Sequence, residues 1–70
     1  MPQFSIEFDR ENDGRWIAEI PALPGALCYG DTQENAQRKV EALALRILAD
    51  RIESGADVPE IAGAFIPHPA

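Results

Sequence analysis

Residues that build disulfides, metal sites and catalytic centres are scarce in this chain of 70 amino acids. Cys28 is the single cysteine and cannot form an internal disulfide, and with His68 it offers no metal-ligand set of plausible spacing. A free cysteine with no partner that lowers its pKa behaves mostly as a small apolar residue. His68 lies in a proline-flanked tail, where the fixed geometry of a general base is hard to maintain. We therefore expect a protein that is not an enzyme and that has no metal and no cofactor.

Basic residues are also few, and they form no block anywhere in the chain. Six Lys and Arg stand against twelve Asp and Glu, which gives a net charge of −6. Direct binding of nucleic acid by this chain alone is disfavoured, because a phosphate-binding domain needs a positive face. An acidic surface suits a basic protein partner, or it serves only to keep the protein soluble.

Long apolar runs are missing as well. No stretch of about eighteen apolar residues is present and no signal-peptide core follows Met1, so we expect a cytoplasmic protein that does not contact a membrane. The length predicts one domain over residues 1–70, without a C-terminal DNA-binding domain. Because a core this small has no disulfide to support it, we expect self-association into a homo-oligomer, either a dimer or a tetramer.

Alternating apolar and polar residues predict two antiparallel strands at the start of the chain. The first covers residues 3–9, and the second covers residues 15–20 after a turn at Asp13-Gly14. The residues assigned to the core face are Phe4, Ile6, Phe8, Trp16, Ala18 and Ile20. Ile17 falls on the polar face, where it is either a stray apolar residue or part of a patch that faces a partner.

Residues 20–25, with two prolines and a glycine, form the joint at which the sheet must break. A short third strand is predicted over residues 26–29, ending at Gly30. A long helix then starts at Asp31 or Thr32, with Asp31 and Glu34 fitting a capping box, and continues to about Ser54. Gly55 offers the left-handed residue that ends many helices.

The helix is predicted to have two apolar faces when its residues are placed about 100° apart. The stripe expected to face the sheet contains Ala36, Val40, Leu43, Ala44 and Ile47. Leu45, Leu48 and Ile52 fall on a second sector, which the small sheet cannot cover. We therefore expect these three residues to serve self-association.

The tail, residues 56–70, leaves two alternatives. Residues 61–66 could add a fourth, edge strand because prolines flank the segment, or the tail could be an arm that docks on the second apolar sector of its own or a neighbouring helix. The predicted fold is α+β: a small antiparallel sheet of three or four strands, in the order β-β-β-α-β, packed on one long helix.

Three carboxylates near strand ends raise the alternative of a metal-dependent nuclease. Asp9, Glu19 and Asp31 could together hold a magnesium ion for phosphoryl transfer. Each also has a simpler role, because Asp9 and Glu19 lie on polar strand faces and Asp31 is suited to capping the helix. The simpler roles make the nuclease the weaker interpretation.

One ordered set of residues runs from the hairpin into the first turns of the helix: Gly14, Trp16, Ile20-Pro21, Leu23-Pro24-Gly25, Gly30-Asp31-Thr32, Glu34 and Ala36. This set resembles the HicB-like antitoxin family, the N-terminal domain of antitoxins from type II toxin–antitoxin pairs. The resemblance covers residues 4–55, and it departs from the family at Ala26, where a cysteine is common, and in the segment after Gly55.

The resemblance implies a truncated ribonuclease-H-like fold without that enzyme's catalytic site. It also implies a function: the chain would bind and occlude a small basic HicA-type toxin, a ribonuclease that cleaves messenger RNA. Family members often carry a C-terminal DNA-binding domain, so operator binding by this chain alone is not expected.

The residues expected to contact the toxin are Glu7, Asp9, Ile17 and Glu19. An acidic surface that covers an RNA-binding face should have the same sign of charge as RNA. The alternative function is an orphan homo-oligomeric scaffold domain of the same fold, without a toxin partner.

Overall fold

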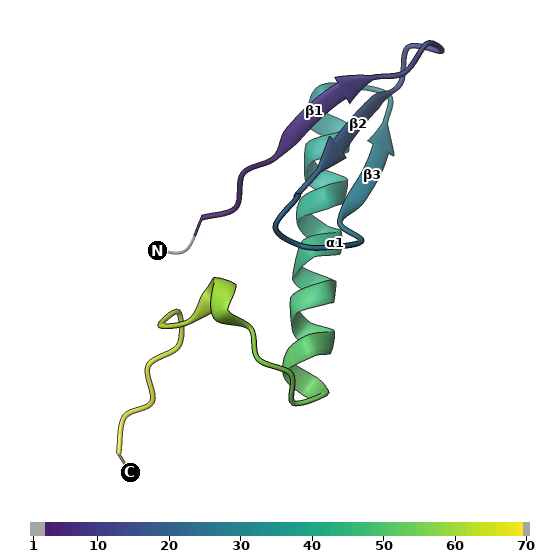
Figure 1. The fold of residues 1–70 in the computed structure, drawn as a ribbon. Helices are drawn as coiled ribbons and strands as arrows, with labels where there is room; N and C mark the ends of the chain where they lie inside the picture. Colours follow the sequence, from purple (N-terminus) through teal and green to yellow (C-terminus); the bar gives the residue numbers. More distant parts are fainter. Residues whose placement is uncertain (1–2, 70) are drawn as a thin grey trace.

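The fold is a three-stranded antiparallel sheet with one long helix, so the predicted α+β class is confirmed. A computed structural model describes residues 3–69 (Figure 1). Along the chain its elements are β1 (Glu7–Arg10), β2 (Trp16–Glu19), β3 (Leu27–Gly30), α1 (Gln33–Glu53) and the short 3-10 helix η1 (Pro59–Ile61). The strand order is β1-β2-β3, with β2 at the centre.

The β1–β2 hairpin is shorter than the sequence predicts. Its register pairs Glu7 with Glu19 and ends there, so residues 3–6 are not part of the sheet. The reason lies in the opposite strand: after Glu19 the chain turns away at Ile20-Pro21, and proline has no N–H to offer a neighbouring strand. Phe4 and Ile6 nevertheless pack against the core, as their alternation predicts.

The joint between β2 and β3 folds into two successive tight turns. The N–H of Leu23 donates to the Ile20 carbonyl at 3.0 Å, and the N–H of Ala26 donates to the Leu23 carbonyl at 3.0 Å. The loop closes where the N–H of Ile20 donates to the Ala26 carbonyl at 2.9 Å. Leu23 and Ala26 are both buried, so the joint also closes one end of the core.

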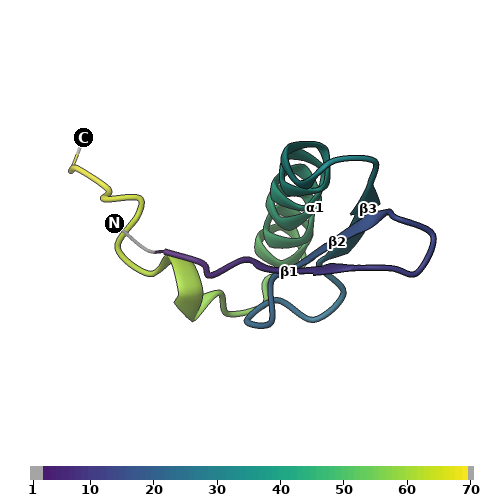
Figure 2. The same cartoon turned by 90° about the horizontal axis from the view of Figure 1, so that it is seen from above.

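The core lies between α1 and one face of the sheet (Figure 2). The helix packs against β2 and β3, and the residues that it buries are Ala36, Val40, Ala44 and Leu48. From the sheet and the joint come Ala18, Ile20, Leu23 and Ala26. Small side chains dominate this set, which lets the helix lie close to the strands.

The helix start differs from the prediction in its capping residue. Thr32 is the N-cap: its Oγ1 accepts the N–H of Asn35 at 3.0 Å, while Asn35 Oδ1 accepts the N–H of Asp31 at 3.3 Å. The predicted capping box of Asp31 and Glu34 is therefore wrong by one position. Threonine at 32 satisfies the orphan N–H three residues later, which is the role that the N-cap requires.

The helix end is confirmed at the predicted place. After the C-cap residue Ser54, Gly55 has a φ of +82°, in the left-handed region. The N–H of Gly55 donates to the Ile52 carbonyl at 3.1 Å, and the N–H of Ala56 donates to the Arg51 carbonyl at 3.0 Å. This pair of bonds is a Schellman motif, which satisfies carbonyls that would otherwise have no partner.

The prediction that Leu48 lies on the second, uncovered sector of the helix is wrong. Leu48 is only 6% exposed and belongs to the core, whereas Leu45 is 69% and Ile52 is 50% exposed. Residues spaced by four rotate about 40° around an α-helix at each step. The buried stripe from Ala36 to Leu48 therefore slants around the helix and takes in a residue that the wheel assigns to the second sector.

The tail forms no fourth strand within residues 3–69. The η1 turn is tied to the helix by an ion pair of 3.5 Å between Arg51 Nη1 and Glu60 Oε1, and Ile61 packs partly against the core. A further turn follows, in which the N–H of Ala64 donates to the Ile61 carbonyl at 3.0 Å. Because residues 61–64 are bent, they cannot form an edge strand. The tail faces the C-terminal half of α1 across a groove as far as Phe65, and the chain then leads away from the helix (Figure 2).

Candidate protein-binding surface

The sheet has a second face that α1 does not cover (Figure 2). Phe8, Ala18 and Cys28 pair across the three strands and point toward the helix, as the complete burial of Ala18 shows. Because side chains alternate along a strand, the neighbouring residues point the other way. The residues on this outer sheet face are Glu7, Asp9, Ile17, Glu19, Leu27 and Tyr29.

Acidic side chains occupy one side of the outer sheet face. Glu7 lies directly opposite Glu19, and Asp9 follows on the same face of β1. Like charges directly opposite each other across two strands destabilise a sheet. Within residues 3–69 none of these three carboxylates takes part in an ion pair, so the repulsion has no compensation from the chain itself.

Apolar side chains occupy the other side of the same face. Tyr29 pairs with Ile17, and Leu27 pairs with Glu19. Leu27 and Tyr29 are each 41% exposed, while Ile17, on the central strand β2, is partly buried. An exposed apolar area beside charged residues is typical of a surface that binds another protein.

Arg15 closes the hairpin end of the outer sheet face. Its guanidinium carbon lies 4.7 Å from the centroid of the Tyr29 ring, a cation–π arrangement. Asp13 holds Arg15 in place: Arg15 Nε donates to Asp13 Oδ2 at 2.8 Å, and the backbone N–H of Arg15 donates to Asp13 Oδ1 at 3.0 Å. The backbone bond, with the side-chain bond and the nearby positive charge, lowers the pKa of Asp13 below its usual value of 3.8.

The residues considered for chemistry are not brought together. Cys28 faces the core and is partly buried, Asp31 lies exposed before the helix, and His68 is exposed in the tail. Asp9 and Glu19 share the outer sheet face, whereas Asp31 follows the end of β3. In the described residues, no three His, Cys, Asp or Glu side chains are placed to hold one metal ion.

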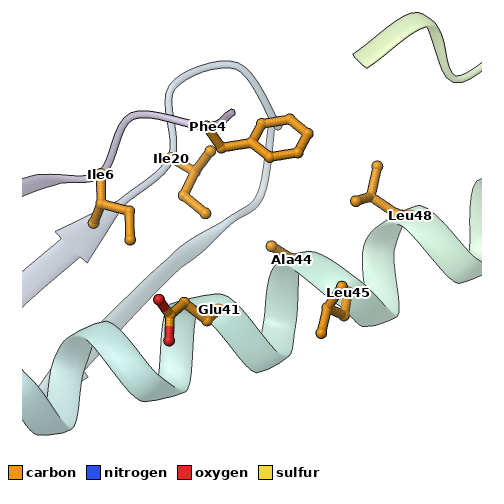
Figure 3. Close-up of a pocket in the computed structure, with 7 residues that line it drawn as sticks. All are labelled: Phe4, Ile6, Ile20, Glu41, Ala44, Leu45 and Leu48. Carbon is orange, nitrogen blue, oxygen red and sulfur yellow. The ribbon is translucent and has the colours of Figure 1, made fainter. Parts of the chain in front are cut away.

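The exposed side of α1 offers a second apolar surface. A groove of about 230 Å³ lies between the N-terminal segment and the helix, with Phe4, Ile6 and Ile20 on one side (Figure 3). Glu41, Ala44, Leu45 and Leu48 form its helical side. A second groove, of about 270 Å³, lies between the helix and the tail residues Ile61, Ala64 and Phe65. Leu45 and Leu48 line both grooves, so the two form one apolar strip.

Comparisons of the chain with models of protein families, with curated proteins and with solved structures found no significant match. Among residues 3–69, no helix has both the length and the apolar character needed to cross a membrane.

The four residues predicted to contact a partner all lie on the outer sheet face. Glu7, Asp9, Ile17 and Glu19 come from two strands, and the antiparallel register brings them together. Leu27 and Tyr29, which supply the exposed apolar area, were not among the residues predicted from the sequence. Their alternation with Cys28 was the available sign, since a core-facing Cys28 places both neighbours on the opposite face.

Proposed function

We propose that this protein is an antitoxin-like binding domain. Its outer sheet face would bind a small basic HicA-type toxin and cover that toxin's RNA-binding surface. The observation that carries the proposal is the uncovered face on which Glu7 opposes Glu19 beside Ile17, Leu27 and Tyr29. The resemblance of residues 4–55 to HicB-like antitoxins agrees with this function. Because the toxin's substrate is messenger RNA, the site of action would be the cytoplasm.

Charge and apolar area have separate roles in this binding. The chain has a net charge of −6, and the unpaired carboxylates attract a basic partner over long range and align it. Affinity then comes mainly from the apolar residues that become buried at the centre of the contact. A basic side chain placed between Glu7 and Glu19 would also remove the repulsion between them. The face therefore gains more from a basic partner than from a neutral one.

Co-expression with the product of the adjacent gene, which the proposal expects to be a small basic protein, tests this function. We expect that protein to stop growth alone and to be neutralised by the wild-type chain. Replacing Glu7 and Glu19 together by Lys should abolish the neutralisation, because the variant repels the toxin. The matched control is Glu53→Lys, a charge reversal near the exposed end of α1 that should still neutralise.

Two results would contradict the proposal. One is a basic neighbour whose expression does not affect growth. The other is full neutralisation by the Glu7→Lys, Glu19→Lys double variant when circular dichroism shows that this variant is folded.

The exposed Leu45 and Ile52 favour a second candidate function, a homo-oligomeric scaffold domain without a toxin. The absence of any short basic reading frame next to the gene would support this second function.

A further inference from the structure

The exposed side of α1 repeats small and large apolar residues at heptad spacing. Ala42, Leu45, Ala49 and Ile52 follow one another at intervals of three, four and three residues, and all four are exposed. This spacing corresponds to positions a, d, a and d of a coiled coil. We call these four residues the helix seam. It lies on the side of α1 away from the buried stripe that faces the sheet.

The charges on the two flanks of the helix seam have opposite signs over residues 34–46. Glu34 and Glu41 occupy g positions on one flank, and Lys39 and Arg46 occupy e positions on the other. The next e position, near the helix end, is the acidic Glu53. Neither Lys39 nor Arg46 forms an ion pair within residues 3–69. Both basic side chains are therefore available to a carboxylate of another molecule.

We propose that the helix seam binds a second copy of this chain, with the two α1 helices parallel. In a parallel pair each g position faces the next e position of the other helix. Glu41 of one copy then meets Arg46 of the second copy, on both sides of the pair. An antiparallel pair centred on the seam places each Lys39 near Glu53 of the other copy, but it also brings the two Arg46 side chains together. Along the apolar part of the seam the parallel arrangement has two attractive pairs and no repulsive one, so charge complementarity favours it.

The sizes of the side chains along the helix seam suit a pair of helices. Alanine at the a positions lets two helices approach closely, while Leu45 and Ile52 fill the d layers. At the next d position toward the N-terminus the chain has Arg38, where the apolar part of the seam ends. Leu45 also lines both grooves beside the helix, so a second helix would cover the exposed apolar strip as well as the seam. The dimer does not involve the outer sheet face.

Sedimentation or light scattering of the purified full chain tests the dimer. We expect a mass of twice the 7.7 kDa chain at high micromolar concentration. Leu45→Asp should reduce that mass by half, and because Leu45 is 69% exposed the variant should keep its circular dichroism spectrum. The matched control is Leu27→Asp on the outer sheet face, which should remain a dimer. A monomeric wild type, or a dimer that survives Leu45→Asp, would overturn the proposal.

Two further measurements test the direction of the helices. Glu41→Arg or Arg46→Glu alone should raise the dissociation constant of the dimer several-fold. The double variant should restore it, because the acidic and basic side chains then only exchange places. In a Cys28→Ala background, Ala42→Cys should cross-link to itself on oxidation. The exposed loop variant Ala22→Cys should not.

The antiparallel arrangement predicts a different cross-link. Position 42 would then face position 52 of the second copy and would lie about 15 Å along the axis from the other position 42. A cross-link between cysteines at 42 and 52, with none between the two cysteines at 42, would therefore overturn the parallel arrangement. All of these tests use the free protein, so their outcome is independent of toxin binding.

Discussion

Gly30 is the residue at which the sheet and the helix come closest. A Cβ at this position would lie 2.5 Å from the Ala36 backbone nitrogen and 2.8 Å from its Cα. Real Cβ atoms do not approach backbone this closely, so one of the two elements would have to move. The sequence set that contains Gly30-Asp31-Thr32 thus has a steric reason as well as a role in turning the chain.

Gly30→Ala should destabilise the fold by about 1–3 kcal/mol, the usual cost of overpacking a core. Urea denaturation measures this free energy of unfolding. The matched control is Gly55→Asn, because Gly55 has open space around it and asparagine tolerates the left-handed region. An equal loss in the two variants would show that the close contact at Gly30 has no special effect.

Substitutions at Thr32 and Asp31 distinguish which of the two residues caps α1. Thr32→Val removes the oxygen that accepts the N–H of Asn35 while keeping the side chain's shape, and it should cost about 1 kcal/mol of stability. Asp31→Asn leaves that bond intact and should cost only a few tenths of that amount. Thermal or urea unfolding of the two variants gives the comparison. A larger loss for Asp31→Asn would restore Asp31 as the cap.

At the scale of elements, the sequence predicts the order of strands and helix because each change of period is marked. Asp13-Gly14 marks the hairpin, the two prolines mark the joint, and Gly55 marks the helix end. Strand lengths were not predictable in the same way. Residues 3–6 alternate like a strand, but whether they pair depends on where the opposite strand turns away.

The residues of the outer sheet face were also only partly predictable from single segments of the sequence. Alternation within one strand correctly put Ile17 and Glu19 on the outer sheet face. Alternation with Cys28 assigns Leu27 and Tyr29 to the same face, but their place beside Ile17 and Glu19 follows only from the register between β2 and β3 across the joint. Leu48 was misplaced because its burial depends on a stripe that slants around α1 and on Phe4, which lines the same groove.

At the scale of the whole molecule, the sheet and the helix lie back to back and each keeps one face uncovered. The outer sheet face is acidic on one side and apolar on the other, and the helix seam is apolar with charged residues on both flanks. A dimer formed through the two helices would leave both outer sheet faces exposed on opposite sides. One dimer could then bind two toxin molecules without the two interfaces overlapping.

The most direct test of the central claim is an NMR titration of the isotopically labelled protein with the product of the adjacent gene, which the proposal expects to be a small basic toxin. We predict that amide signals of Ile17, Leu27 and Tyr29 shift on binding, while those of Leu45 and Ile52 remain unchanged. The shifts should weaken as salt is added, because unpaired carboxylates steer the complex. Shifts confined to α1, or no binding at low salt, would contradict the account.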